Sequence, residues 1–334
     1  MRDFFKRALN ALNILGVLCF CLALPAAAQT QKEINFGIIS TESSSNLRNI
    51  WDPFLADMSR QTGFKVNAFF ASDYAGIIQG IRFDKVDIAW MGNKAAMEAV
   101  DRAGAEVIAQ TVAANGDAGY WSVLLAHKDS PYTSVEEVLK NAREISFGNG
   151  DPNSTSGFLV PGYYVFAQNG VDPKQIFKRT LNANHEANAL AVANKHVDIA
   201  TNNTENLDRL KITAPDKFQQ LKVIWKSPLI PSDPLVIRKN LDAGTQKTLK
   251  DFLFGYGKNA EEKKKLEALQ WAPFRVSNDD QLLPIRQLEL FKQQATVKAD
   301  GSLSEKEKNE RLNEINAELA KLDRRMKDLE LARK

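Results

Sequence analysis

The chain has 334 residues, of which 44% are hydrophobic and 25% are charged, and its formal net charge is +3. This is the composition of an ordinary globular protein, and it excludes a disordered tail, a collagen-like repeat and a bundle of membrane helices. The charge is too evenly balanced to indicate a nucleic-acid-binding surface, and the length predicts about two domains.

The N-terminus has the pattern of a secretory signal peptide. Three basic side chains precede an uncharged stretch over 8–24, and an alanine-rich end over 25–28 follows. A membrane anchor is the alternative, but it requires about 20 apolar residues, and this stretch is shorter and interrupted by two asparagines. We therefore predict a signal peptide over 1–28, cleavage after Ala28 and export to the periplasm. Cys19 and Cys21 both lie in the signal, so the exported chain contains no disulfide and must be stabilised by its cores.

The sequence contains an internal duplication. Ile-Asn-Phe-Gly at 34–37 recurs 111 residues later as Ile-Ser-Phe-Gly at 145–148, and Val-Asp-Ile-Ala at 86–89 recurs at the same offset at 197–200. Each half has the β–α alternation that predicts largely parallel sheets covered by helices. In each half the Val-Asp-Ile-Ala strand runs into a polar segment, and ligands of open α/β sheets bind beyond the carboxyl ends of the strands. Two such lobes facing each other predict a ligand cleft.

Two segments are expected to connect the lobes. An apolar strand at 120–126 leads into the second unit, and the strand at 222–225, followed by three prolines, forms a stiff return crossing. Two crossings predict a hinge. We expect lobe 1 over 29–122 and 228–300, lobe 2 over 123–227, and a helical tail over 301–334.

A polar loop at 148–157 lies between a predicted strand and a helix expected to begin near Ser156. Its Ser154-Thr155-Ser156 run offers hydroxyl groups beside the unpaired N–H groups of a helix start, which is a typical anion site. Helix capping by serine or threonine alone is the alternative. No Gly-Lys-Ser/Thr follows, so the loop is not a nucleotide-binding P-loop.

Enzyme motifs are not indicated. His185-Glu186 begins like a zinc-protease motif, but Ala189 occupies the position of the second histidine. A Ser154–His185–Asp233 triad could be drawn, yet the chain has no Gly-x-Ser-x-Gly elbow. Three scattered histidines and no cysteine in the exported chain also argue against a metal cluster or an activated nucleophile. We predict a protein that is not an enzyme and that uses no cofactor or metal.

The tail has a heptad-like apolar stripe at spacings of three and four, formed by Leu312, Ile315, Leu319, Leu322, Met326 and Leu329. Such a stripe predicts a helix that buries one face. It either packs on its own lobe or pairs with a second copy of the chain, and the second alternative predicts a weak homodimer through the tail.

Four segments resemble the phosphonate-binding periplasmic protein of a bacterial phosphonate ABC transporter. They lie at 35–42, 71–80, 151–157 and 201–206, and the similarity extends from the end of the signal to about Arg286. The resemblance implies an α/β, bilobal type II periplasmic binding protein fold, with two lobes joined by a two-strand hinge. It also implies the capture of alkylphosphonates, notably of the 2-aminoethylphosphonate class, for delivery to a membrane permease. A ligand-sensing subunit for a membrane receptor would use the same fold and pocket, and an exported phosphoester or phosphonate hydrolase is the third alternative.

The resemblance also implies the site residues. The phosphonate ligands correspond to Tyr74, Tyr120, Ser154, Thr155 and His185, with Ser156 adjacent, and the ammonium partners correspond to Glu205 and Asp233. Hydroxyl groups and helix N–H groups would supply the donors that a phosphonate requires, and the two carboxylates would attract an ammonium and repel an unaccompanied phosphate. The structural alternatives are a helix-start acid for Glu205 and a turn acid for Asp233. One departure from the family is Met91, where the family has a tyrosine.

Overall fold

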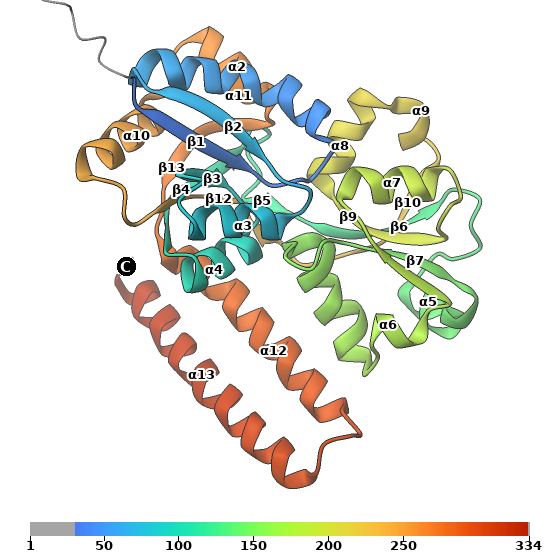
Figure 1. Ribbon diagram of the computed structural model, residues 1–334. Coiled ribbons are helices and arrows are strands. Elements are labelled where there is room, and N and C mark those ends of the chain that lie inside the picture. Colours follow the sequence, from blue (N-terminus) through green and yellow to red (C-terminus); the bar gives the residue numbers. More distant parts are fainter. Residues whose placement is uncertain (1–30, 333–334) are drawn as a thin grey trace, which may run out of the picture. The chain divides into compact units, whose positions relative to one another are not determined.

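The computed structural model describes residues 31–332, so the predicted signal peptide and its cleavage after Ala28 lie outside the described residues. From Glu33 onwards the chain is built on two mixed sheets of six and five strands and a two-stranded ladder that connects them (Figure 1). This architecture confirms the predicted α/β class with two lobes, a two-strand connection and a helical tail.

The strands of the three sheets are as follows. The six-stranded sheet contains, in spatial order, β13 (Trp271–Val276), β4 (Ala105–Ala113), β12 (Pro234–Arg238), β3 (Ile88–Trp90), β1 (Glu33–Ile38) and β2 (Lys65–Phe70). The five-stranded sheet contains β10 (Leu221–Lys226), β6 (Ser122–His127), β9 (Ile199–Asn203), β7 (Ser146–Asn149) and β8 (Arg179–Asn182). The ladder pairs β11 (Ile230–Pro231) with β5 (Gly119–Tyr120).

The helices are α2 (Ser44–Thr62), α3 (Tyr74–Arg82), α4 (Asn93–Arg102), α5 (Val135–Lys140), α6 (Pro173–Ile176), α7 (His185–Ala193), α8 (Thr204–Thr213), α9 (Pro215–Phe218), α10 (Ala243–Gly255), α11 (Ala260–Ala268), α12 (Leu283–Ala299) and α13 (Glu305–Ala332). A further helical segment over 155–169 contains π-helical turns at Thr155–Leu159 and Gly162–Phe166 and a 3₁₀ turn at Ala167–Asn169. Short 3₁₀ turns occur at Ala142–Glu144 and Asp279–Leu282. Over residues 31–332, none of the helices combines the length and apolar character needed to cross a membrane.

The sheets are less parallel than the sequence predicts. The pairs β1–β2, β1–β3, β7–β8 and β7–β9, at one side of each sheet, are parallel, but β12, β13, β6 and β10 add antiparallel ladders. The antiparallel strands flank the two crossings or follow the return to the first sheet, so they are not part of the repeated βαβ unit. Alternation of strands and helices predicts only that repeated unit.

The internal duplication is confirmed by the register of the strands. Phe36 pairs with Ile88 between β1 and β3, and Phe147 pairs with Ile199 between β7 and β9, at the same offset of the repeat. The repeated aspartate also has the same role twice. One carboxylate oxygen of Asp87 accepts from the Asn35 N–H at 2.8 Å, and one of Asp198 accepts from the Ser146 N–H at 2.7 Å. The repeat is therefore a structural unit and not a coincidence of composition.

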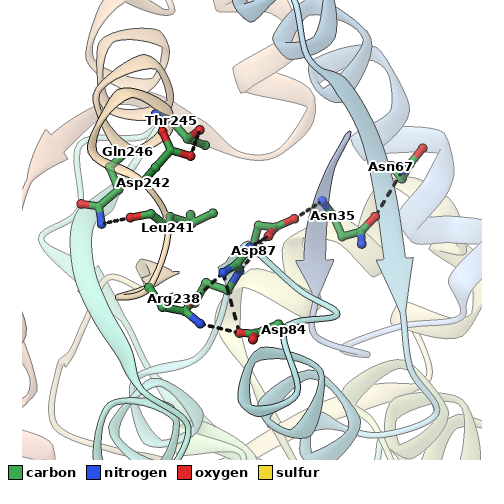
Figure 2. A network of polar contacts seen from close by, with 10 residues as sticks. Asn35, Asn67, Asp84, Asp87, Arg238, Leu241, Asp242, Thr245 and Gln246 are labelled. Carbon is green, nitrogen blue, oxygen red and sulfur yellow. Dashed lines mark hydrogen bonds and ion pairs between the residues drawn. The ribbon is translucent and has the colours of Figure 1, made fainter. Parts of the chain in front are cut away.

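The two aspartates differ in burial and in charge partner, and Figure 2 shows the contacts of Asp87 with Asn35 and Arg238. Asp87 is 6% exposed, and its second oxygen accepts from Arg238 of β12 at 2.8 Å and 2.7 Å. Asp198 is exposed, and it accepts hydrogen bonds from the N–H and hydroxyl groups of Ser146. In the first lobe, the repeated aspartate therefore forms a buried ion pair, and this pair joins the start of β3 to β12.

The crossings are displaced from their predicted positions. The strand expected at 120–126 is split: Gly119–Tyr120 belongs to the connecting ladder, and Ser122–His127 is an inner strand of the five-stranded sheet. The strand expected at 222–225 is the edge strand β10 of that same sheet, so the return crossing lies over 227–233. The correction has a simple cause, because apolar runs identify strands but do not show which sheet a strand joins.

The tail helix α13 packs along α12 (Figure 1). Ile315 and Leu319 are buried, and the other four residues of the apolar stripe are half-buried. Two side-chain hydrogen bonds, from Gln294 to Asn316 and from Gln287 to Asp323, join the two helices. The stripe is therefore covered by the same chain, which is the first of the two alternatives left open by the sequence.

We predict that Asp87→Ala lowers the free energy of unfolding by about 3 kcal/mol, because the partly buried charge of Arg238 loses its short ion pair and keeps only the longer contact with Asp84, at 3.7 Å. The matched variant Asp198→Ala removes the equivalent side chain of the second repeat from an exposed position and should cost about 1 kcal/mol. Urea denaturation of both variants measures the difference, and equal costs would contradict the assigned role of the Arg238 pair.

Candidate functional site

One cavity lies at the junction of the two sheets and the connecting ladder, and its wall contains all eight residues singled out from the sequence: Tyr74, Tyr120, Ser154, Thr155, Ser156, His185, Glu205 and Asp233. All are buried except Glu205, which is half-buried. The space open to the centre of a water-sized atom is about 40 Å³. A single water needs roughly 10–15 Å³ on this measure, so the cavity has room for a small molecule.

Helix starts converge on this cavity. Tyr74 and His185 are the first residues of α3 and α7, and Thr155 is the first residue of the segment over 155–169. Gly92 and Asn203, which are the N-caps of α4 and α8, also line the wall. Each helix start carries N–H groups without helical partners and the positive end of the helix dipole. Five of them around one small volume create a positive potential that favours an anion.

The loop at Ser154–Ser156 is held by hydrogen bonds that leave its hydroxyl protons available. Ser154 caps its helix by accepting from the Gly157 N–H at 2.9 Å, and Thr155 accepts from the Lys94 N–H at 2.9 Å. Ser156 accepts from the Asn203 side-chain amide at 3.1 Å. Each hydroxyl therefore uses a lone pair in the protein and can still donate its proton, so capping and anion binding are compatible in this loop.

His185 faces the same loop. Its Nε2 lies 3.4 Å from the hydroxyl oxygens of Ser154 and Ser156, and its Nδ1 is buried without a hydrogen-bond partner. Burial lowers the pKa of His185 to about 4, so the imidazole is neutral at physiological pH. The anion-favouring end of the cavity is thus made of neutral hydroxyl, amide and imidazole groups.

The other end of the cavity carries acidic side chains. Asp233 lies just before β12 and accepts hydrogen bonds from the Tyr120 hydroxyl at 2.9 Å and from the Asn93 amide at 3.4 Å. Burial, and then the nearby Glu205, raise the pKa of Asp233 well above its usual value. Burial also raises the pKa of Glu205 to about 7, although Arg209 opposes this shift. Two neighbouring carboxyl groups do not readily ionise together, and a cation between them would stabilise the charged form of both.

Contacts across the cleft show that the lobes are closed. The Glu186 carboxylate of α7 accepts from the Ser43 N–H at 2.7 Å at the start of α2, and Asp151 accepts from the Tyr74 N–H at 3.1 Å at the start of α3. The Thr155 contact with Lys94 makes a third such bond at α4. Side chains that follow strands of the five-stranded sheet therefore bond to the helix starts of the six-stranded sheet.

Several wall residues were not singled out from the sequence. Trp51, Trp90 and Trp271 form an aromatic wall, and Glu42, Asn206 and Arg209 add polar groups. Glu42 follows the first strand of the repeat and Arg209 lies one turn after Glu205, so both positions could have been tested as neighbours of predicted residues. Met91, the departure from the family pattern, is completely buried in the core of the first lobe and is not part of the wall.

The comparisons with known proteins agree with this geometry. A family model described as "ABC transporter, phosphonate, periplasmic substrate-binding protein" matches residues 36–282. The chain belongs to this family. This phosphonate-binding protein is 62% identical over 304 residues to the phosphonates-binding periplasmic protein of Escherichia coli (strain K12), covering 91% of this chain and 90% of the relative.

Solved structures confirm the fold of the phosphonate-binding protein. The binding-protein component of an ABC phosphonate transporter from Pseudomonas aeruginosa has a TM-score of 0.89 and 66% identity, covering 90% of this chain and 99% of that chain. PhnD1 from Prochlorococcus marinus, solved in complex with methylphosphonate, has a TM-score of 0.68 at 22% identity, covering 77% and 97% of the two chains. The protein is accordingly the periplasmic phosphonate-binding component of an ABC transporter and not an enzyme.

Proposed function

We propose that the protein captures aminoalkylphosphonates of the 2-aminoethylphosphonate class between its two lobes and delivers them to the transporter permease. One observation supports this proposal above the others: the donor-rich helix starts and the carboxyl groups of Glu205 and Asp233 face the same small cavity. A ligand with an anion at one end and a cation at the other would satisfy both ends.

The phosphonate would occupy the end formed by Tyr74, Ser154, Thr155, Ser156 and His185, with Tyr120, whose hydroxyl donates to Asp233, between this end and the acidic one. A phosphonate has three oxygens and up to two negative charges, so it requires many donors. Hydrogen bonds to charged groups contribute about 1.5–3 kcal/mol each. Four or five of them would be sufficient for micromolar binding, which requires a net free energy of only about −8 kcal/mol.

The ammonium would occupy the end formed by Glu205 and Asp233. At a separation of roughly 6 Å and an effective dielectric constant of about 20, a pair of opposite unit charges contributes about 3 kcal/mol. The same carboxylates would repel inorganic phosphate, which brings no compensating cation. Selectivity between these ligands would then depend partly on repulsion.

We also propose that the two lobes move as separate bodies about the connecting ladder, with lobe 1 over 29–122 and 228–300 and lobe 2 over 123–227. The ladder of β5 with β11 supports this proposal, because it is a short element between two larger sheets. Tyr120 lies in that ladder and its hydroxyl bonds to Asp233 of the return crossing. A hinge built in this way would bring its own side chains into the closed site.

We predict that calorimetric titration gives tighter binding for 2-aminoethylphosphonate than for ethylphosphonate or inorganic phosphate. Glu205→Gln and Asp233→Asn should each weaken 2-aminoethylphosphonate by roughly tenfold or more while changing ethylphosphonate less, because only the first ligand carries the ammonium. Thermal melting checks that each variant is folded. An equal loss for both ligands would mean that these carboxyl groups are structural and not ammonium partners.

We predict that 2-aminoethylphosphonate binds more tightly as the pH rises from 6 to 8. Because the pKa of Glu205 is raised to about 7 and that of Asp233 is also raised, the free protein holds a proton at this end at low pH, and ammonium binding releases it. Loss of one proton changes the affinity by at most about tenfold per pH unit. Titrations of wild type and Glu205→Gln with this one ligand remove the ligand's own ionisation from the comparison. Identical pH dependences in the two proteins would refute the proton release.

The weak homodimer through the tail stays a prediction. Since the stripe of α13 faces α12, a second copy would have to use the outer, charged face of the tail. Light scattering over a concentration series should give a larger mass for the full chain than for a chain ending at Asp300, and phosphonate binding should survive the truncation. Monomer masses for both chains would refute the dimer, and an increase in mass on truncation would instead report association through the uncovered face of α12.

A further inference from the structure

An ion pair between Arg209 and Glu42 lies at the acidic end of the cavity, and the role proposed for it below rests on the proposed function. The Arg209 Nε lies 2.6 Å from the Glu42 carboxylate, and the Arg209 side chain also donates to the Gln270 side-chain oxygen at 3.4 Å. Arg209 belongs to α8 of the second lobe, whereas Glu42 follows β1 of the first lobe and Gln270 precedes β13. The guanidinium is therefore held by the first lobe across the closed cleft.

The acidic side chains around the cavity outnumber the basic ones by two. Among the described residues of the wall, Glu42, Glu205 and Asp233 are acidic, and Arg209 is the one basic side chain besides neutral His185. The ion pair of Arg209 is with Glu42. Glu205 and Asp233 then remain for the cation that the ligand would bring. The guanidinium is held by Glu42 and Gln270, although it still opposes the rise in the pKa of Glu205.

Glu205 is the nearest alternative partner for Arg209 on its own helix. The two residues are four positions apart on α8, in the order in which a glutamate and a basic residue pair favourably on a helix surface. With the lobes apart, Glu42 and Gln270 are withdrawn, and nothing in the first lobe holds Arg209 away from Glu205. A guanidinium beside Glu205 would neutralise the carboxylate and compete with an ammonium for it.

We propose that Glu42 is a positioning residue for amine selectivity: on closure it takes Arg209 from Glu205 and so leaves that carboxylate to the ammonium of the ligand. Cleft closure and recognition of the cation are coupled through this exchange. Glu42 is 5% exposed, so the pair forms in a partly desolvated place where charges interact strongly. Burial raises the pKa of Glu42, and Arg209 opposes this shift by stabilising the carboxylate.

The test compares the dissociation constants of 2-aminoethylphosphonate and ethylphosphonate by calorimetry. Wild type establishes the preference for the amine, and equal affinities there would overturn the proposed function and this inference with it. Glu42→Gln should reduce the preference by roughly tenfold, the value of one hydrogen bond between charged groups. Glu42→Asp keeps the negative charge, so it should retain part of the preference for 2-aminoethylphosphonate. If Glu42→Gln is unstable, Glu42→Asp provides a variant that still tests the position of the charge.

Two further variants separate positioning from simple closure. Glu186→Gln removes another acid that bonds across the cleft, at Ser43, but lies outside the cavity wall, so it should weaken both ligands alike and leave their ratio unchanged. Glu42→Gln combined with Arg209→Gln should regain the preference, because the competitor of the ammonium is gone and the net charge of the wall is that of wild type. A double variant as unselective as Glu42→Gln alone, or a Glu42→Gln protein with the wild-type ratio, would overturn the proposal.

Discussion

The closed cleft depends on the need of helix starts for hydrogen-bond acceptors. The first N–H groups of a helix have no helical partner and must bond elsewhere. In this protein three of them, at Ser43, Tyr74 and Lys94 in the first lobe, bond to side-chain oxygens of the second lobe. Closure therefore satisfies groups that separation of the lobes would leave to water. The N–H and O–H groups that remain unused surround a small cavity, which is where an anion would bind.

The duplication explains why these helix starts face one another. The caps Asp73 and Asn184 are 111 residues apart, as are Gly92 and Asn203, and the residues after the first pair are Tyr74 and His185. Two copies of one βα unit thus present equivalent positions to the same volume, and divergence between the copies gives each position its own chemistry. Gly92 illustrates the fit, because a Cβ there would lie 3.3 Å from the Thr155 hydroxyl, which must approach this close to bond across the cleft.

Local pattern was sufficient for the repeat, the paired lobes and the Ser154–Ser156 loop, because each of these follows from strand ends and helix starts that are visible in sequence. The full set of eight site residues came from the resemblance to the family and not from the pattern. It was insufficient for the cross-cleft pair of Glu42 with Arg209, which depends on how two lobes meet and has no periodic signature. The tail shows the same limit. The stripe from Leu312 to Leu329 predicted that one face of the tail helix is buried. It did not predict that α12 covers this face, because α12 does not repeat the heptad pattern of the stripe. The sequence also did not predict which sheet the strands at 122–127 and 221–226 join, because this depends on contacts between residues far apart in the chain.

The helical segment that begins at Thr155 also links the cavity to the C-terminal helices. Further along it, Tyr163 stacks on Phe291 of α12 with ring centres 6.1 Å apart, and the Lys292 ammonium lies 4.6 Å from the centre of the Phe158 ring. Because α12 also packs on α4 of the first lobe, it contacts both lobes. The helix α12 is therefore packed against the same helical segment that supplies Thr155 to the cavity wall, so the C-terminal helices and the cavity share one structural support.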